Sequence, residues 1–120
     1  MNFEPKDFIN ISKELSSGST EAHYRSIINR AYYGVFGHIK KQLPIYVLDA
    51  SVHQEVIRAL KRSPDVIEKK VGSRLETLFK KRKDADYSYN IPVRKDSCSF
   101  TILEAEEIIK LFDSKKAEDQ

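Results

Sequence analysis

The sequence predicts an all-α protein, an antiparallel helical bundle of four to five helices. Apolar residues recur at the three- and four-residue spacing of helices along most of the chain. Residues that typically begin helices stand just ahead of these apolar runs. No convincing strand appears, because the apolar stretch at 45–48 is short and lacks a partner. The 120 residues, 40% hydrophobic, suffice for one core, so we expect a single domain over residues 1–120 with its core at about 5–114.

The first two helices are expected at about 5–15 and 20–43. Pro5 suits a first helical position, and Thr20 can cap the second helix, which Pro44 ends. The first helix places Phe8, Ile11 and Leu15 at helical spacing. The second has a wide apolar set, so we expect it to be central and buried over much of its girth. That set is Tyr24, Ile27, Ile28, Ala31, Tyr32, Val35, Phe36 and Ile39.

The third and fourth helices are expected to begin at clear start signals. Ser51 with Gln54 forms a possible capping box, and Ser63-Pro64-Asp65 combines a cap, a first-turn proline and an acid. The fourth helix should end near Lys83. The residues expected to face inward are Val52, Val56, Ile57, Leu60, Val66, Ile67, Val71, Leu75, Leu78 and Phe79. Gly72 within the fourth helix indicates close helix packing or a weaker helix.

The last part of the chain is expected to hold a long loop and one more helix. Residues 84–99 show no sustained period, which is typical of an irregular and often functional segment. Thr101 with Glu104 predicts a capping box for the fifth helix. Its expected apolar residues are Leu103, Ile108, Leu111 and Phe112. The polar residues 115–120 are expected to fray.

Composition excludes several classes of protein. A single cysteine, Cys98, cannot form an internal disulfide framework or a cysteine-rich zinc module. No stretch approaches the ~20 apolar residues of a membrane span, and the first residues do not resemble a signal peptide. We therefore expect a cytoplasmic protein without a membrane partner. Glycine-rich phosphate loops, nucleophile elbows and histidine–glutamate zinc motifs are missing from the sequence, and the three histidines lack metal-ligand spacing, so we predict no metal and no cofactor.

Charge is unevenly distributed along the chain. Residues 58–83 hold ten lysine and arginine residues against three acids, whereas residues 101–120 hold six acids and three bases. A basic segment of this size favours a phosphate-rich partner such as RNA, although lysine-rich helix surfaces are also common without one. The residues predicted to contact RNA are Lys61, Arg62, Lys80, Lys81 and Arg82.

The most informative motif lies in the second expected helix. Arg30 stands beside an apolar face, where an arginine is costly unless it is paired with an acid or directed at an anion. The run Arg30-Ala-Tyr-Tyr-Gly-Val-Phe resembles the hallmark of the HEPN superfamily, which reads Arg-Ala-Tyr-Tyr-Ala-x-Phe-His in small prokaryotic members. Other segments of the resemblance follow the family's order, over about residues 6–113. They are Tyr24-Arg25-Ser26, Ser51-Val52-His53 and Arg82-Lys-Asp-Ala-Asp-Tyr87.

The resemblance implies an all-α HEPN fold that pairs as a homodimer. Many members are metal-independent endoribonucleases that act as toxins of toxin–antitoxin pairs or in phage defence. Their active site is an arginine followed, after four to six residues, by a histidine. The arginine can bind the scissile phosphate, and the histidine can move a proton near neutral pH. Carried over to this chain, the resemblance implies catalytic Arg30 and His38, supported by Tyr33, Asp86 and Tyr87.

The sequence departs from the motif at the histidine. Gly37 occupies the family's histidine position, and His38 follows it, about 80° around a helix from Arg30. Two hypotheses of function remain open. The first is an RNA-directed toxin or phage-defence ribonuclease that uses Arg30 and His38. The alternative is a non-catalytic dimeric module that binds RNA, a nucleotide or a partner such as a nucleotidyltransferase-type antitoxin. A third, weaker hypothesis is a small helical bundle with an unrelated structural role. For Arg30 itself the alternative to phosphate binding is a structural arginine paired with an acid such as Asp86.

Overall fold

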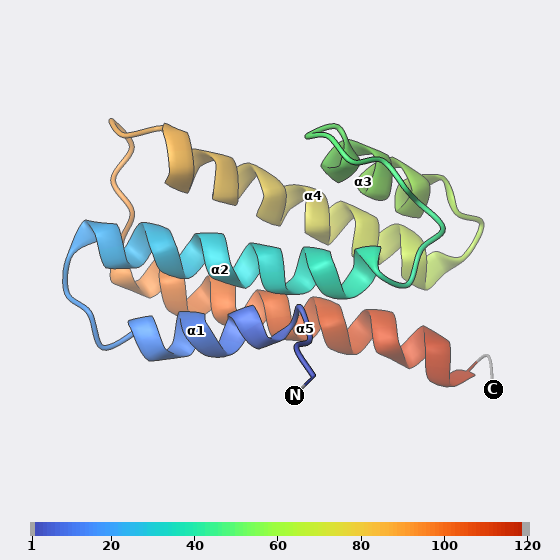
Figure 1. Ribbon diagram of the computed structural model, residues 1–120, viewed down its shortest axis with the longest axis horizontal. Helices are drawn as coiled ribbons and strands as arrows, with labels where there is room; N and C mark the ends of the chain where they lie inside the picture. Colours follow the sequence, from blue (N-terminus) through green and yellow to red (C-terminus); the bar gives the residue numbers. More distant parts are fainter. Residues whose placement is uncertain (1, 119–120) are drawn as a thin grey trace.

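Five α-helices and no strand make up the part of the protein that the computed structural model describes, residues 2–118, with side chains described through residue 115 (Figure 1). The helices are α1 (Asp7–Leu15), α2 (Glu21–Lys40), α3 (Val52–Arg62), α4 (Val66–Tyr87) and α5 (Lys95–Glu118). The predicted all-α bundle is therefore confirmed. Among the described residues, no helix is both long enough and apolar enough to cross a membrane.

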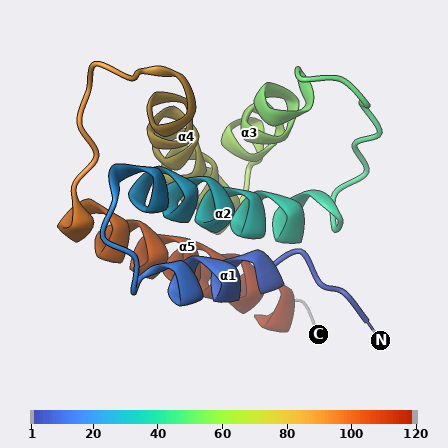
Figure 2. The ribbon, with the colours of Figure 1, turned by 60° about the vertical axis from the view of Figure 1, so that its left-hand side comes forward.

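The helices form three layers with α2 in the middle. Figure 2 shows α3 and α4 on one side of α2, and α1 and α5 on the other. The predicted central position of α2 is confirmed, because Ala31, Tyr32, Val35 and Ile39 are all 0% exposed. Burial of such side chains stabilises the fold by about 1.5–3 kcal/mol each.

Two helix starts show how side chains compete for the first backbone amides. The predicted cap of α2 is confirmed, since Thr20 Oγ1 accepts a hydrogen bond from the His23 amide at 3.3 Å. In α4 the cap is Asp65, whose carboxylate accepts from the Glu68 amide at 2.9 Å. Ser63, two residues earlier, accepts from the Asp65 amide at 3.1 Å instead. The start signal was therefore correct, but Asp65 provides the cap.

The expected capping box of α3 is wrong. Ser51 already has helical backbone angles (φ −69°, ψ −9°) and makes no side-chain cap. Its hydroxyl instead donates to Asp49 Oδ1 at 2.5 Å, because the aspartate just before it offers a stronger acceptor. The end of α2 also differs, since the helix stops at Lys40 rather than near residue 43.

The loop expected at 84–99 is much shorter in the structure. Helix α4 continues to Tyr87, and α5 begins at Lys95. Arg25 of α2 stabilises this tight connection, donating to the Ala85 carbonyl at 2.9 Å and to the Ile91 carbonyl at 2.7 Å. These bonds satisfy carbonyls that the end of a helix leaves free.

The expected start of the fifth helix was therefore too late. Thr101 lies inside α5, fully buried, and its hydroxyl donates to the Ser97 carbonyl at 2.8 Å rather than capping. Three residues of the expected apolar sets are exposed, Ile11 at 40%, Leu103 at 62% and Val66 at 64%. Helix α5 continues through Glu118, and the rest of the tail expected to fray, residues 119–120, lies outside the described residues.

Candidate functional site

Residues of the basic segment line a groove between α3 and α4 that has a volume of about 440 Å³. Gly72 allows the two helices to approach closely, because a Cβ added there would lie 2.9 Å from Leu60 Cβ. Five bases and one acid line the groove over an apolar floor. The lining residues are Gln54, Ile57, Arg58, Lys61, Arg62, Glu76, Phe79, Lys80 and Lys83.

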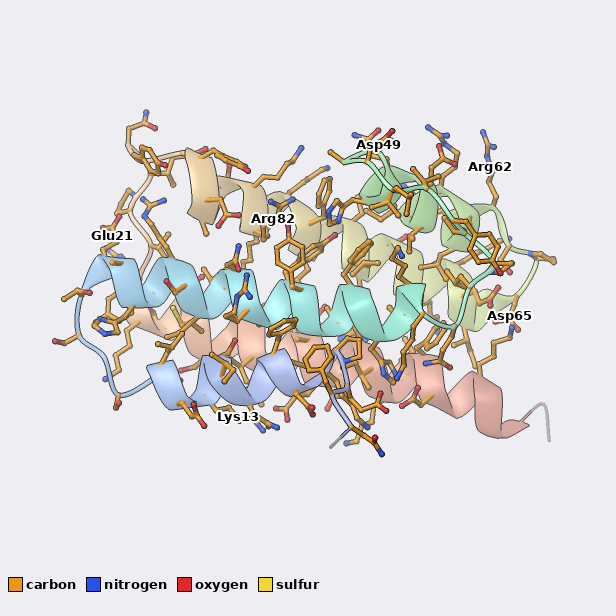
Figure 3. The ribbon with its side chains drawn as sticks, in the orientation of Figure 1. Lys13, Glu21, Asp49, Arg62, Asp65 and Arg82 are labelled. Atoms are coloured by element: carbon orange, nitrogen blue, oxygen red, sulfur yellow. The ribbon has the colours of Figure 1, made fainter. Side chains whose placement is uncertain are left out.

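Most of the positive charge in this α3–α4 groove is not neutralised within the protein. Two of the five groove cations are paired: Lys61 with Glu76, the groove's one acid, and Arg58 with Glu55, each at 2.8 Å. Among the described side chains, Arg62, Lys80 and Lys83 take part in no ion pair, and Lys83 Nζ lies 4.8 Å from the centre of the Phe79 ring. Figure 3 shows Arg62 projecting away from the end of α3. The groove therefore presents cations to an anionic partner.

The five predicted RNA contacts do not all lie in this groove. Lys61, Arg62 and Lys80 line it, as their prediction requires. Lys81 faces α5 instead, with its Nζ 4.6 Å from the centre of the Phe100 ring. Arg82 is only 6% exposed and lies between α4 and α2 (Figure 3), so it has no surface from which to contact RNA directly.

Sequence reasoning missed Arg58 and Lys83 as groove residues. A helical-spacing signal was available for both. Arg58 precedes Lys61 and Arg62 by three and four residues, and Lys83 follows Lys80 by three, so each shares a helix face with a predicted contact.

Buried Arg82 forms the centre of an aromatic and polar cluster. Its guanidinium carbon lies 5.3–5.4 Å from the ring centres of Tyr32, Tyr33 and Phe79. It donates to Asp86 Oδ2 at 3.1 Å, while its Nε has no hydrogen-bond partner among the described residues. Asp86 thus holds a buried cation, which agrees with a supporting role inside the fold.

Arg30 lies outside the groove, on the side of α2 that faces α1. Its Nε donates to Asn29 Oδ1 at 2.7 Å, and its guanidinium covers the rings of Phe8 and Tyr33 at 4.9 and 5.5 Å. Asn29 in turn donates to both carboxylate oxygens of Asp86, at 3.0 and 3.1 Å. Asp86, the acid suggested as a partner for Arg30, is therefore connected to Arg30 only through Asn29. The arginine that pairs with Asp86 directly is Arg82.

His38 faces α5 and is 5% exposed. Its Nε2 lies 2.8 Å from Asp113 Oδ1, and its ring packs edge-on against Phe112 at 6.2 Å. Its Nδ1 is buried without a hydrogen-bond partner among the described residues. Arg30 lies against Phe8 and Tyr33, whereas His38 lies against Phe112 and Asp113, so these contacts do not bring the predicted catalytic pair together.

The position of the family's histidine is covered by the segment before α1. A Cβ added at Gly37 would lie 2.6 Å from Pro5 Cβ, closer than such atoms approach. A histidine at this position therefore requires the N-terminal segment to move. The last predicted supporting residue, Tyr87, is 70% exposed. Tyr89, within the α4–α5 connection, lies against Arg25 of α2 instead, with the guanidinium carbon 5.7 Å from its ring centre.

His53 is a further histidine, which sequence reasoning placed only in the first turn of α3. Its Nδ1 lies 2.7 Å from the hydroxyl of Tyr32. Its ring stacks on the ring of Phe79, with the two ring centres 5.2 Å apart and the ring planes at 15° to each other. The centre of the Phe36 ring lies 4.2 Å from the centre of the imidazole. Burial, followed by the nearby charge of Arg82, lowers the pKa of His53 to about 4. The imidazole is therefore neutral at physiological pH.

Within the part of the chain that the structure describes, no group of three or more histidine, cysteine or acidic side chains could hold a metal ion. Comparison of the chain with models of protein families, with curated proteins and with solved structures found no match. The α3–α4 groove is therefore the candidate functional site.

Proposed function

We propose that this protein is a non-catalytic, HEPN-like helical module that binds RNA through the phosphate backbone. One observation carries the proposal: five lysine and arginine side chains converge on the α3–α4 groove, where the one acid is already paired. Cations in such a groove bind a nucleic-acid strand by displacing its condensed counterions. The groove's apolar floor, Ile57 and Phe79, favours a single strand, whose bases can stack on apolar side chains, over a duplex.

The geometry favours binding without cleavage over the ribonuclease hypothesis. A nuclease of the HEPN type needs an arginine and a proton-transferring histidine at the same phosphate. His38 is 5% exposed and engaged by Asp113 of α5, whereas Arg30 contacts Phe8 and Tyr33. From the resemblance we keep a homodimer, a nucleotidyltransferase-type partner and a toxin–antitoxin or phage-defence role as parts of the proposal. From the composition we keep a cytoplasmic location.

The proposal is tested by measuring binding and cleavage in one sample. A fluorescently labelled single-stranded RNA is mixed with the protein in EDTA at about 50 mM salt, where electrostatic binding is strong. We expect the fluorescence anisotropy to rise with protein concentration while the RNA stays intact on a denaturing gel.

Two variants separate the hypotheses. Arg30→Ala and His38→Gln should bind RNA as the wild type does, because neither side chain lines the groove. Cleavage by the wild type that both variants lose would establish the ribonuclease hypothesis instead. Unchanged anisotropy at saturating protein would refute RNA binding altogether.

A further inference from the structure

His53 adjoins the α3–α4 groove at the start of α3. The next residue along the helix, Gln54, lines the groove, and so does Phe79, on which the imidazole stacks. The charged and titratable groups facing His53 are Tyr32 and Tyr33 from α2 and Arg82 from α4. The imidazole itself does not line the groove, but it stacks on Phe79, which does, and it faces the buried Arg82 cluster.

The hydrogen bond to Tyr32 fixes which ring nitrogen carries the proton. The tyrosine is 0% exposed, and its hydroxyl has one hydrogen-bond partner among the described residues, His53 Nδ1. Burial raises the pKa of this hydroxyl, so it keeps its proton. If the imidazole donated, the hydroxyl proton would be buried without an acceptor, which is costly. The hydroxyl therefore donates to Nδ1, and the neutral ring carries its proton on Nε2.

The Nε2 atom remains free to bind a ligand. It has no hydrogen-bond partner among the described side chains, and it is not one of the two buried side-chain atoms found unpaired there, which are His38 Nδ1 and Arg82 Nε. It therefore keeps contact with solvent. A fixed N–H donor beside Phe79, which lines the groove, suits a phosphate oxygen, which accepts hydrogen bonds but cannot donate them.

We propose that His53 contacts phosphate at the edge of the groove, where its Nε2–H donates a hydrogen bond to a non-bridging oxygen of a bound RNA strand. This inference rests on the proposed RNA binding. The phosphate's negative charge favours the imidazolium, so binding should raise the pKa of His53 above its value in the free protein. The complex then takes up a proton that the free protein does not. RNA affinity should accordingly rise as the pH falls through the raised pKa and stay constant above it.

Nuclear magnetic resonance of the imidazole nitrogens tests this contact. In the free protein at pH 7, we expect His53 Nε2 to carry the proton and Nδ1 to lack it, with the signals assigned from a His53→Gln variant. Addition of a short uridine oligoribonucleotide should shift the Nε2 signal and raise the pKa. The signals of His23, whose Nδ1 is bound to Thr20 outside the groove, serve as an internal control and should not move.

The outcomes separate this inference from the proposed function. Anisotropy that rises with RNA while the His53 signals stay unchanged overturns the contact and leaves RNA binding intact. A free protein with its proton on Nδ1 also overturns it. Unchanged anisotropy overturns the proposed function, and the contact with it.

Two matched substitutions give an independent readout. In a Tyr32→Phe background, which removes the hydroxyl that would otherwise lose its partner, His53→Phe keeps an aromatic ring but no donor, and should weaken RNA binding about 3- to 10-fold. His53→Gln in the same background retains an amide N–H near the Nε2 position and should lose less affinity. Thermal unfolding verifies that both variants are folded. Equal affinities for the glutamine and phenylalanine variants would contradict the contact.

Discussion

Replacement of Arg62, Lys80 and Lys83 together by glutamate should weaken RNA binding at least about 100-fold near physiological salt. These three groove cations have no ion-pair partner among the described side chains, so their charge is available to phosphates. Each contact with a single strand contributes about 0.7 to the slope of log affinity against log salt, so the slope should flatten by about 2. Fluorescence anisotropy across a salt series measures both effects.

A second triple variant provides the matched control. Lys6, Arg94 and Lys95 are exposed and lie in or beside α1 and α5, away from the groove. Their replacement by glutamate changes the net charge by the same amount as the groove variant. We expect only a small loss of affinity, because long-range repulsion between exposed charges is screened by salt. If both triple variants weaken binding equally, RNA follows the net charge and the groove is not the site.

Removal of the Asp86 carboxylate should lower the free energy of unfolding by about 3 kcal/mol, since a buried charge left without its partner costs about 3–5 kcal/mol. The side chain of Arg82 is 8% exposed, and Asp86 is the carboxylate that pairs with it. Asn29 loses its acceptor in the same change. The side chain of Asp86 is itself 20% exposed. Water can therefore enter the space that the carboxylate leaves, solvate Arg82 and offset part of the lost stability. Urea unfolding of Asp86→Ala, followed by circular dichroism, measures the difference.

A double variant identifies the cause of this destabilisation. Arg82→Met with Asp86→Ala removes the buried cation together with its partner and keeps an apolar chain between the rings of Tyr32, Tyr33 and Phe79. We expect it to recover most of the stability that Asp86→Ala loses, as replaced buried ion pairs often do. A double variant as unstable as Asp86→Ala would show that the loss comes from elsewhere, such as the contact with Asn29.

The helices could be predicted from sequence because their signals are local. The apolar spacing of α2 and the Thr20 cap both lie within the segment that they specify. The boundary between α4 and α5 could not be predicted in this way. It depends on Arg25, whose guanidinium bonds carbonyls 60 and 66 residues later in the chain. Local propensity therefore predicted a loop at 84–99, whereas the side chain of Arg25, distant in sequence, supports a shorter connection between α4 and α5.

The candidate site was predictable in charge but not in detail. Lys80, Lys81 and Arg82 are adjacent in sequence, but each residue of a helix points about 100° away from the one before it. Lys80 therefore lines the groove, Lys81 faces α5, and Arg82 lies in the core. Helix geometry did indicate that His38 leaves the face of Arg30, and the structure places it against α5. The surroundings of His53 come from α2 and α4, and no spacing within α3 reveals them.

The most direct test of the groove is an acetylation footprint of the wild-type lysines, read by mass spectrometry with and without a saturating single-stranded RNA. Lysines that hold phosphates react more slowly with the acetylating reagent. We predict that RNA protects Lys61, Lys80 and Lys83, while the reactivity of Lys6 and Lys95 stays unchanged. Protection of Lys6 and Lys95 with the three groove lysines still reactive would contradict RNA binding between α3 and α4.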